Sequence, residues 1–378
     1  MNFFKSVFAT VVGIFLFMLL SFFLLIGLGA LLGSGEDKVK LKGNSVIQLD
    51  LAKINFDYAG KYESDSPFSS LMMSKDKVGF IEVLKAIDAA KTDDKIKGIT
   101  LVNNQSGLGL AQSKELRDKL EDFKKSKKFV MAYANIYSQK EYYISSIADQ
   151  VYLNPAGEVD FKGLGTEMLF FKNFQDQTGL KMEIIRHGKF KSAVEPYLAQ
   201  EISPENREQV TVLLQSVWKT IVTDIAKNRN ISVAQLNTIA DGLLARTPQM
   251  ALQQKLVDKV AYEDEFNDML KSKLKVAKDE DVESISITDY VSNSSDKSED
   301  YTKDDIIAVI YAQGQINGGE GDVDYIGEGS INRSLKEARE DEDVKAIVLR
   351  VDSPGGSALV SELIWREIEL TKKVKPVV

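Results

Sequence analysis

The stretch KAIVLRVDSPGGS, residues 345–357, places two glycines directly after a strand-like run and could bind an anion there. Within it, Ala346–Val351 is apolar and β-branched apart from Arg350, which is typical of a strand buried on both faces of a parallel sheet. An amphipathic helical pattern follows the turn, and ligands of open α/β sheets bind at such carboxyl ends of strands. Gly355 and Gly356 are therefore candidate backbone donors to an anion or oxyanion. SPGG alone also fits an ordinary tight turn.

Two lysines, Lys189 and Lys191, lie in the sequence HGKFKSAVEPY, residues 187–197. A lysine can serve as general base for a serine nucleophile if burial lowers its pKa, because desolvation disfavours the ammonium form. Such a Ser-Lys dyad needs no histidine. From this local sequence alone, solvated lysines in a loop are the more common arrangement, and Glu195 could pair with a basic side chain or cap a turn.

The composition excludes several other chemistries. The chain of 378 residues has no cysteine and one histidine, His187. These counts exclude a cysteine nucleophile and a structural Cys/His zinc site, and a Ser-His-Asp triad would depend on a histidine with no evident orienting carboxylate beside it. The net charge of −8, from 48 basic and 56 acidic residues, gives no signature of nucleic-acid binding. The sequence predicts no metal and no cofactor.

The N-terminal segment, residues 1–34, is predicted to be a transmembrane signal anchor. Residues 6–33 carry no charge, and at about 1.5 Å per residue they are longer than a hydrocarbon core of about 30 Å. Cleavage near residues 29–33, where small side chains occur, is the alternative. Lys5 favours a cytoplasmic N-terminus with the bulk of the chain outside, although three lysines in residues 38–42 oppose that orientation.

The remaining chain predicts an α/β fold with a parallel sheet, because short apolar strands alternate with helical patterns. The expected strands are Ser45–Leu51, Ile96–Val102, Lys128–Tyr133 and Gln150–Leu153, with helices over Phe80–Ala90 and around Leu116–Phe123.

The same order of elements occurs twice. A shift of 248 residues aligns Ile87–Val130 with Leu335–Val378 without a gap, and TDDKIKGITLVNNQSG lies over EDEDVKAIVLRVDSPG. The matches fall at equivalent points of a strand, a turn and a helix, which indicates two copies of one unit. Only the second copy has the full SPGGS; the first has QSGLG.

Four parts of the chain follow from these patterns. After the anchor, residues 45–278 are expected to form the first α/β repeat, with a mostly helical extension from about residue 163 that carries the lysines. Residues 279–305, rich in Ser, Asp and Lys, are expected to be a linker. Residues 306–378 would be an incomplete second repeat that stops on entering a strand, so we expect the sequence to be a fragment of a longer protein.

FKSAVEPY (190–197), the following EISPENREQ, LRVDSPGGSALVSELI and YSQKEYYISSIADQVYLNP (137–155) together resemble the long-form signal peptide peptidases of the protease IV type. The resemblance implies a membrane-anchored Ser-Lys endopeptidase with tandem Clp protease/crotonase-like repeats. It also implies that Lys191 is the general base and that Gly355 and Gly356 lie at the oxyanion-binding backbone.

The nucleophilic serine that this resemblance implies is absent from the chain. In the first copy the aligned residue is Gln139, and the repeat offset places the nucleophile at position 387, nine residues beyond Val378. Ser138 aligns instead with the alanine that precedes the family's serine. The resemblance thus implies a dyad built across the two repeats, and we expect residues 1–378 alone to be inactive.

The resulting hypothesis is a serine endopeptidase that degrades cleaved signal peptides and similar peptides on the extracytoplasmic side of a bacterial cytoplasmic membrane, anchored by a single pass. The resemblance implies a ring-like homo-oligomer, such as a tetramer. One alternative is a non-catalytic membrane-tethered scaffold for peptide binding or assembly. A crotonase-like acyl-CoA enzyme would share the fold and the use of backbone N–H groups to stabilise an oxyanion. The predicted N-terminal membrane anchor and the sequence FKSAVEPY argue against it.

Overall fold

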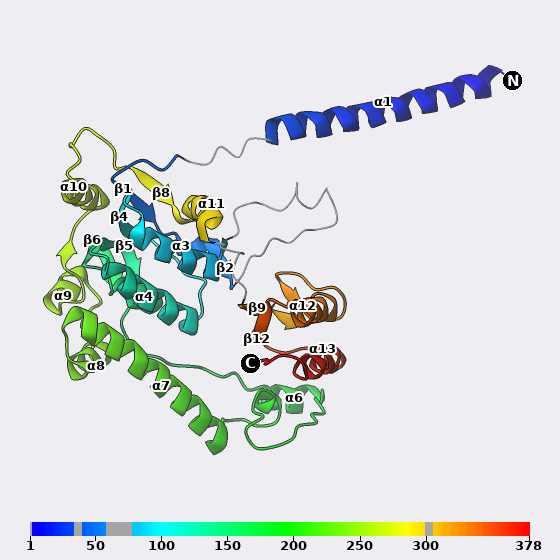
Figure 1. Ribbon diagram of the computed structural model, residues 1–378. Coiled ribbons are helices and arrows are strands. Elements are labelled where there is room, and N and C mark those ends of the chain that lie inside the picture. Colours follow the sequence, from blue (N-terminus) through cyan, green and yellow to red (C-terminus); the bar gives the residue numbers. More distant parts are fainter. Residues whose placement is uncertain (1, 34–39, 58–77, 299–304) are drawn as a thin grey trace. The chain divides into compact units, whose positions relative to one another are not determined.

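The computed structural model of the chain describes residues 2–33, 40–57, 78–298 and 305–378. The first of its two compact units, residues 1–40, contains the helix α1 (Asn2–Gly33). Within α1, Lys5–Leu24 is long and apolar enough to cross a membrane, since about 20 apolar residues suffice. The sequence prediction of an apolar N-terminal helix is confirmed (Figure 1).

The second unit, residues 41–378, is built on a six-stranded sheet in which every pair of neighbours is parallel. This confirms the predicted α/β class. The first predicted strand ends early, at Gln48, because the Asp50 side chain caps a short 3₁₀ turn, η1 (Leu51–Lys53). In spatial order the strands are β7 (Lys259–Val260), β6 (Gln150–Val159), β5 (Phe129–Tyr137), β4 (Ile96–Val102), β1 (Ser45–Gln48) and β8 (Ser284–Ser286).

Both faces of this sheet are covered, which explains why its strands are continuous apolar runs. The neighbours Val46 and Ile47 on β1 belong to two different cores. The larger core contains buried residues of α3 (Phe80–Thr92), α4 (Leu110–Lys124) and α5 (Gln139–Ser145). The smaller core contains apolar residues of α10 (Glu263–Leu274) packed on Tyr133 and Tyr152. Two short strands, β2 (Ile54–Phe56) and β3 (Val78–Gly79), pair beside α3.

The extension after β6 is less helical than predicted. Its first part contains only the short helices α6 (Lys172–Thr178) and η2 (Glu195–Tyr197), and residues 179–192 have no regular secondary structure apart from turns. Contacts other than helical ones hold this part of the extension: the N–H of Met182 donates to Gln175 Oε1, and the N–H of Phe171, before the irregular residues, donates to Pro196 O after them. The later part is helical, as expected, over α7 (Pro204–Arg229), α8 (Val233–Asp241) and α9 (Pro248–Gln253).

Part of the segment expected to be a linker is ordered. Residues 284–298 form the edge strand β8 and the helix α11 (Ile287–Ser298), which packs against α3. The reason is the spacing of Ile285, Ile287 and Tyr290, which are buried in the larger core although most of their neighbours in sequence are polar.

Residues 305–378 form a second set of α/β elements with its own core. β9 (Ile306–Gln313) and β12 (Val344–Asp352) are paired in parallel over eight positions, and β10 (Gln315–Ile316) pairs with β11 (Tyr325–Ile326). The helices α12 (Glu328–Glu340) and α13 (Ala358–Thr371) pack on each other. β12 thus leads directly into the SPGGS turn, and α13 follows it, as the sequence predicted.

Candidate active site

The turn after β12 is held to β10 by backbone hydrogen bonds on both sides of its glycines. The N–H of Ile316 donates to Gly355 O at 3.0 Å, and the N–H of Ser357 donates to Ile316 O at 2.9 Å. Gly355 has φ of 102°, a conformation that favours glycine. Ser357 caps α13 by accepting from Val360 N–H. The turn is therefore a fixed connection between strand and helix, as the strand-turn-helix pattern predicted.

The two glycine amides differ in availability. Gly355 N–H donates to Ser353 Oγ at 3.1 Å, so a hydroxyl within the turn already engages it. Within the described part of the chain, Gly356 N–H has no acceptor. A backbone N–H that no protein group engages is free to donate to an incoming oxyanion. Of the two candidate donors, Gly356 is therefore the better placed in this structure.

Substitution of Gly356 by alanine tests this description of the turn. A Cβ atom there would lie 2.1 Å from Ile316 O, and we expect the free energy of unfolding to fall by about 2 kcal/mol, as in other overpacked sites. In urea unfolding, Gly43→Ala is the matched control because its Cβ meets nothing within 4 Å, and we expect a change below about 0.5 kcal/mol. Equal destabilisation by the two substitutions would contradict the close approach of Gly356 to Ile316.

Lys191 lies in the irregular segment between α6 and α7, with an exposed side chain. Its carbonyl accepts from Arg186 Nη1 at 3.4 Å. In the described residues, no hydrogen bond or ion pair involves its Nζ, and none joins it to the SPGGS turn. The described residues therefore do not supply the burial that would suit a lysine base. His187 is exposed in the same segment, whereas Lys189 forms an exposed ion pair with Glu205.

Gln139, which aligns with the expected nucleophile, and its neighbour Ser138 both have structural partners. Ser138 caps α5: its Oγ accepts from Glu141 N–H, and Glu141 Oε2 accepts from Ser138 N–H. The Gln139 side chain accepts from the N–H groups of Lys162 and Gly163 and donates to Gly163 O. Gln139 thus anchors the start of the segment that leads to Lys191.

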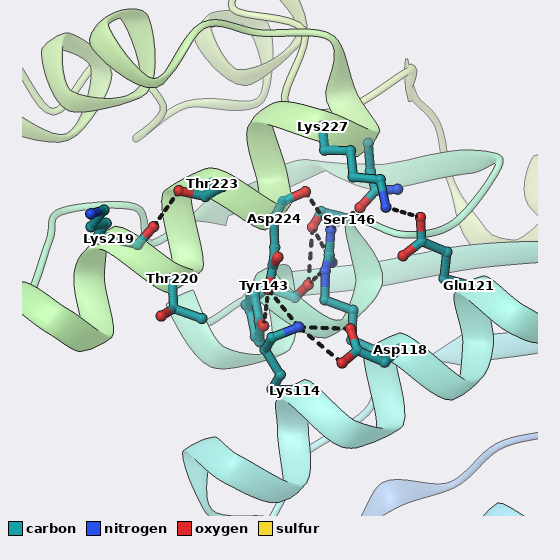
Figure 2. Close-up of polar contacts among 12 residues, drawn as sticks. Lys114, Asp118, Glu121, Tyr143, Ser146, Lys219, Thr220, Thr223, Asp224 and Lys227 are labelled. Atoms are coloured by element: carbon teal, nitrogen blue, oxygen red, sulfur yellow. Dashed lines mark hydrogen bonds and ion pairs between the residues drawn. The ribbon is translucent and has the colours of Figure 1, made fainter.

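The polar cluster in Figure 2 fastens the C-terminal half of α7 to α4 and α5. These helices are joined by Arg117, only 2% exposed, which donates to the carbonyl oxygens of Tyr143 and Asp224 and to side-chain oxygens of Ser146 and Asn228. Tyr143 Oη donates to Asp224 Oδ2 at 2.6 Å. Arg117 therefore positions the helix whose first turn follows the Lys191 segment.

Arg350, the one charge in the apolar run of β12, has a partner that sequence reasoning missed. Its Nε donates to Oδ2 of the buried Asp57 at 2.7 Å, and Gln112 Nε2 donates to Asp57 Oδ1 at 2.6 Å. The N–H of Asp57 donates to Gln313 Oε1 on β9 at 3.0 Å. Asp57 thus connects the first set of α/β elements to the strands β9 and β12 of the second. Apart from the charge of Arg350 within an apolar run, no local pattern indicates this pairing, because the partners are 293 residues apart.

Acid should weaken this connection. Burial raises the pKa of Asp57, but the hydrogen bonds from Arg350 and Gln112 outweigh it and lower the pKa below its ordinary value of 3.8. A depressed folded-state pKa contributes stability above pH 3.8 that is lost as the pH falls through the folded value. We expect Asp57→Asn to cost about 2 kcal/mol at pH 7. Its unfolding free energy should also fall less steeply than that of the wild type below about pH 4. Parallel pH profiles for the two proteins in urea unfolding would contradict this role.

Comparisons with known proteins identify the class of enzyme to which this chain is similar. The model of peptidase family S49 matches residues 122–277. The chain is 36% identical over 311 residues to "Protease 4" of Haemophilus influenzae, covering 80% of this chain and 51% of that protein. It is 35% identical over 308 residues to "Protease 4" of Salmonella typhi, covering 79% and 49%. It is 32% identical over 301 residues to "Serine protease SPPA, chloroplastic" of Arabidopsis thaliana, covering 76% and 43%.

The chain belongs to peptidase family S49. It spans about half the length of the curated relatives it matches. Within the family it is a homologue of protease 4, the protease IV type that its sequence resembles.

Proposed function

We propose that the protein containing this chain is a membrane-anchored serine endopeptidase that uses a Ser-Lys dyad to degrade cleaved signal peptides and similar peptides. Membership of peptidase family S49 carries this proposal. The apolar helix α1 supports anchoring in a membrane. We place it in the bacterial cytoplasmic membrane with the α/β part on the extracytoplasmic side, the orientation that Lys5 before the apolar run favours. The protein's partners would be peptide substrates and further copies of itself in a homo-oligomer such as a tetramer.

Tandem repeats are part of the proposal, and the element boundaries support them. Three pairs of elements begin at positions that differ by 248: α3 and α12 at residues 80 and 328, β4 and β12 at 96 and 344, and α4 and α13 at 110 and 358. A short parallel pair precedes the helix in both sets, β2–β3 before α3 and β10–β11 before α12. The offset of 248 residues that aligns the two halves of the sequence is therefore also the offset between the first residues of these helices and strands.

The dyad would be assembled from both repeats. Lys191 is the proposed general base, and the nucleophile is proposed at position 387, which aligns with Gln139. Lys191 would take the serine proton as Oγ attacks the scissile carbonyl, and would return it to the leaving amine. The Gly356 amide, with Gly355 beside it, would stabilise the tetrahedral oxyanion, an interaction whose loss costs about 3 kcal/mol.

Incubation of the detergent-solubilised full-length protein with a synthetic signal peptide tests this function. We expect cleavage products in mass spectrometry, and no cleavage by residues 1–378 alone, because position 139 carries glutamine. Binding of the peptide without hydrolysis by the full-length protein would contradict the peptidase and favour the membrane-tethered scaffold.

A further inference from the structure

A single buried carboxylate fastens the turn that follows Lys191. Glu195 is only 3% exposed, although the preceding residues around Lys191 are largely exposed. Its Oε2 accepts from Asn206 Nδ2 at 2.6 Å, and the N–H of Asn206 donates to Ser203 Oγ at 3.2 Å. Ser203 is the N-cap of α7, and Asn206 lies in its first turn. The carboxylate therefore ties the Lys191 segment to the start of a long helix.

The charge of Glu195 suits this position. Unsatisfied N–H groups and the helix dipole make the first turn of a helix favourable for an anion. Burial raises the pKa of Glu195, but hydrogen bonds from Ser203 and Asn206 and the positive charge of Arg186 outweigh it and lower the pKa. Glu195 is therefore an anion at neutral pH, with donors directed at it from α7.

Further contacts hold the backbone on both sides of Lys191. Before it, Arg186 donates to the Lys191 carbonyl. After it, Pro196 O accepts from Phe171 N–H at 2.7 Å, and the rings of Phe171 and Tyr197 stack at 5.5 Å between centroids. Because the Lys191 Nζ has no partner in the described part of the chain, these backbone anchors determine where the side chain starts.

We propose that Glu195 is a positioning residue for Lys191: through Asn206 it fixes the lysine segment on α7. This inference rests on the proposed function, in which Lys191 is the base. Proton transfer requires hydrogen-bond reach between base and nucleophile, and a displacement of about 1 Å can cost about 100-fold in rate. Loss of the anchor should therefore lower kcat while leaving peptide binding almost unchanged.

The experiment compares Glu195→Ala with Glu201→Ala in the full-length protein acting on a synthetic signal peptide. Glu201 is exposed in the same connection to α7 and carries the same charge. We expect Glu195→Ala to lower kcat between about tenfold and 100-fold with KM changed by less than about twofold. Glu195→Gln, which keeps an oxygen acceptor, should recover most of the loss, and Glu201→Ala should match the wild type. Wild-type kcat in folded Glu195→Ala would overturn the proposal.

Asn206→Ala provides a second route if Glu195→Ala does not fold, because it removes the donor and leaves the carboxylate. We expect it to lower kcat at least fivefold, again with little change in KM; wild-type kcat would overturn the proposal. Where Glu195→Ala folds, kcat of the double variant Glu195→Ala/Asn206→Ala should be no lower than that of the less active single variant, since both substitutions remove the same contact.

Lys191→Ala separates this inference from the proposed function. An inactive Lys191→Ala beside a fully active Glu195→Ala refutes only the positioning role, whereas an active Lys191→Ala refutes the function itself.

Discussion

Lys191→Ala in the full-length protein is expected to lower kcat for signal-peptide cleavage by about 10⁴-fold, the upper range for loss of a general base. KM should change little, because the proposed role of the lysine is in proton transfer rather than in substrate binding. Lys191→Arg should be equally inactive, since a guanidinium keeps the charge but cannot be deprotonated in a protein. Initial rates on a synthetic signal peptide, measured at saturating concentration, give this comparison directly.

Lys189→Ala is the matched control for that experiment. Lys189 lies two residues away, is exposed, and forms an ion pair with Glu205 at 3.6 Å. Exposed pairs of this kind contribute about 0–1 kcal/mol, so the variant should retain its activity within about twofold. If Lys189→Ala were inactive and Lys191→Ala active, the base would be the other lysine of HGKFKSAVEPY.

Arg117→Ala is expected to have the largest effect on stability, lowering the free energy of unfolding by about 3–5 kcal/mol. The truncation would leave a cavity between α4, α5 and α7. It would also remove the donor from four oxygen atoms, on Tyr143, Ser146, Asp224 and Asn228. The cation also lies 4.9 Å from the centroid of the Tyr143 ring, a contact that would be lost too. Urea unfolding of the detergent-solubilised protein, followed by circular dichroism, measures the change.

Lys114→Ala separates the buried arginine from its charged neighbours. Lys114 belongs to the same cluster (Figure 2) and pairs with Asp118 at 2.8 Å, but its side chain is 38% exposed. We therefore expect a loss of at most about 1 kcal/mol. A cost for Arg117→Ala no larger than for Lys114→Ala would show that α7 is held mainly by apolar packing, and the assigned role of the arginine would be wrong.

The sheet was predictable because its strands carry a local signal. Ile96–Val102 was predicted and observed with the same bounds, since a buried parallel strand is a continuous apolar run flanked by polar turns. The helix predicted over Phe80–Ala90 extends to Thr92. The helix α6 ends at Gly179, whose φ of 74° favours glycine.

Contacts between distant segments were not predictable from local sequence. The extension from about residue 163 was expected to be mostly helical, but residues 179–192 within it are irregular, and the N–H of Met182 there donates to the Gln175 side chain rather than to a helical carbonyl. Within the candidate site, the turn at Gly355 and Gly356 was recognised from its letters. The Asp57–Arg350 pair and the Glu195–Asn206 contact were not, because spacing in the sequence does not reveal which buried charge meets which donor.

Active-site labelling of the full-length protein tests the central claim most directly. A fluorophosphonate probe reacts with a serine that a neighbouring base activates, and peptide mapping by mass spectrometry then locates the modified residue. The proposal predicts one labelled serine at position 387, with labelling abolished in Lys191→Ala and retained in Lys189→Ala. Labelling of Ser138, or peptide cleavage that persists with position 387 unmodified, would contradict a dyad assembled across the two repeats.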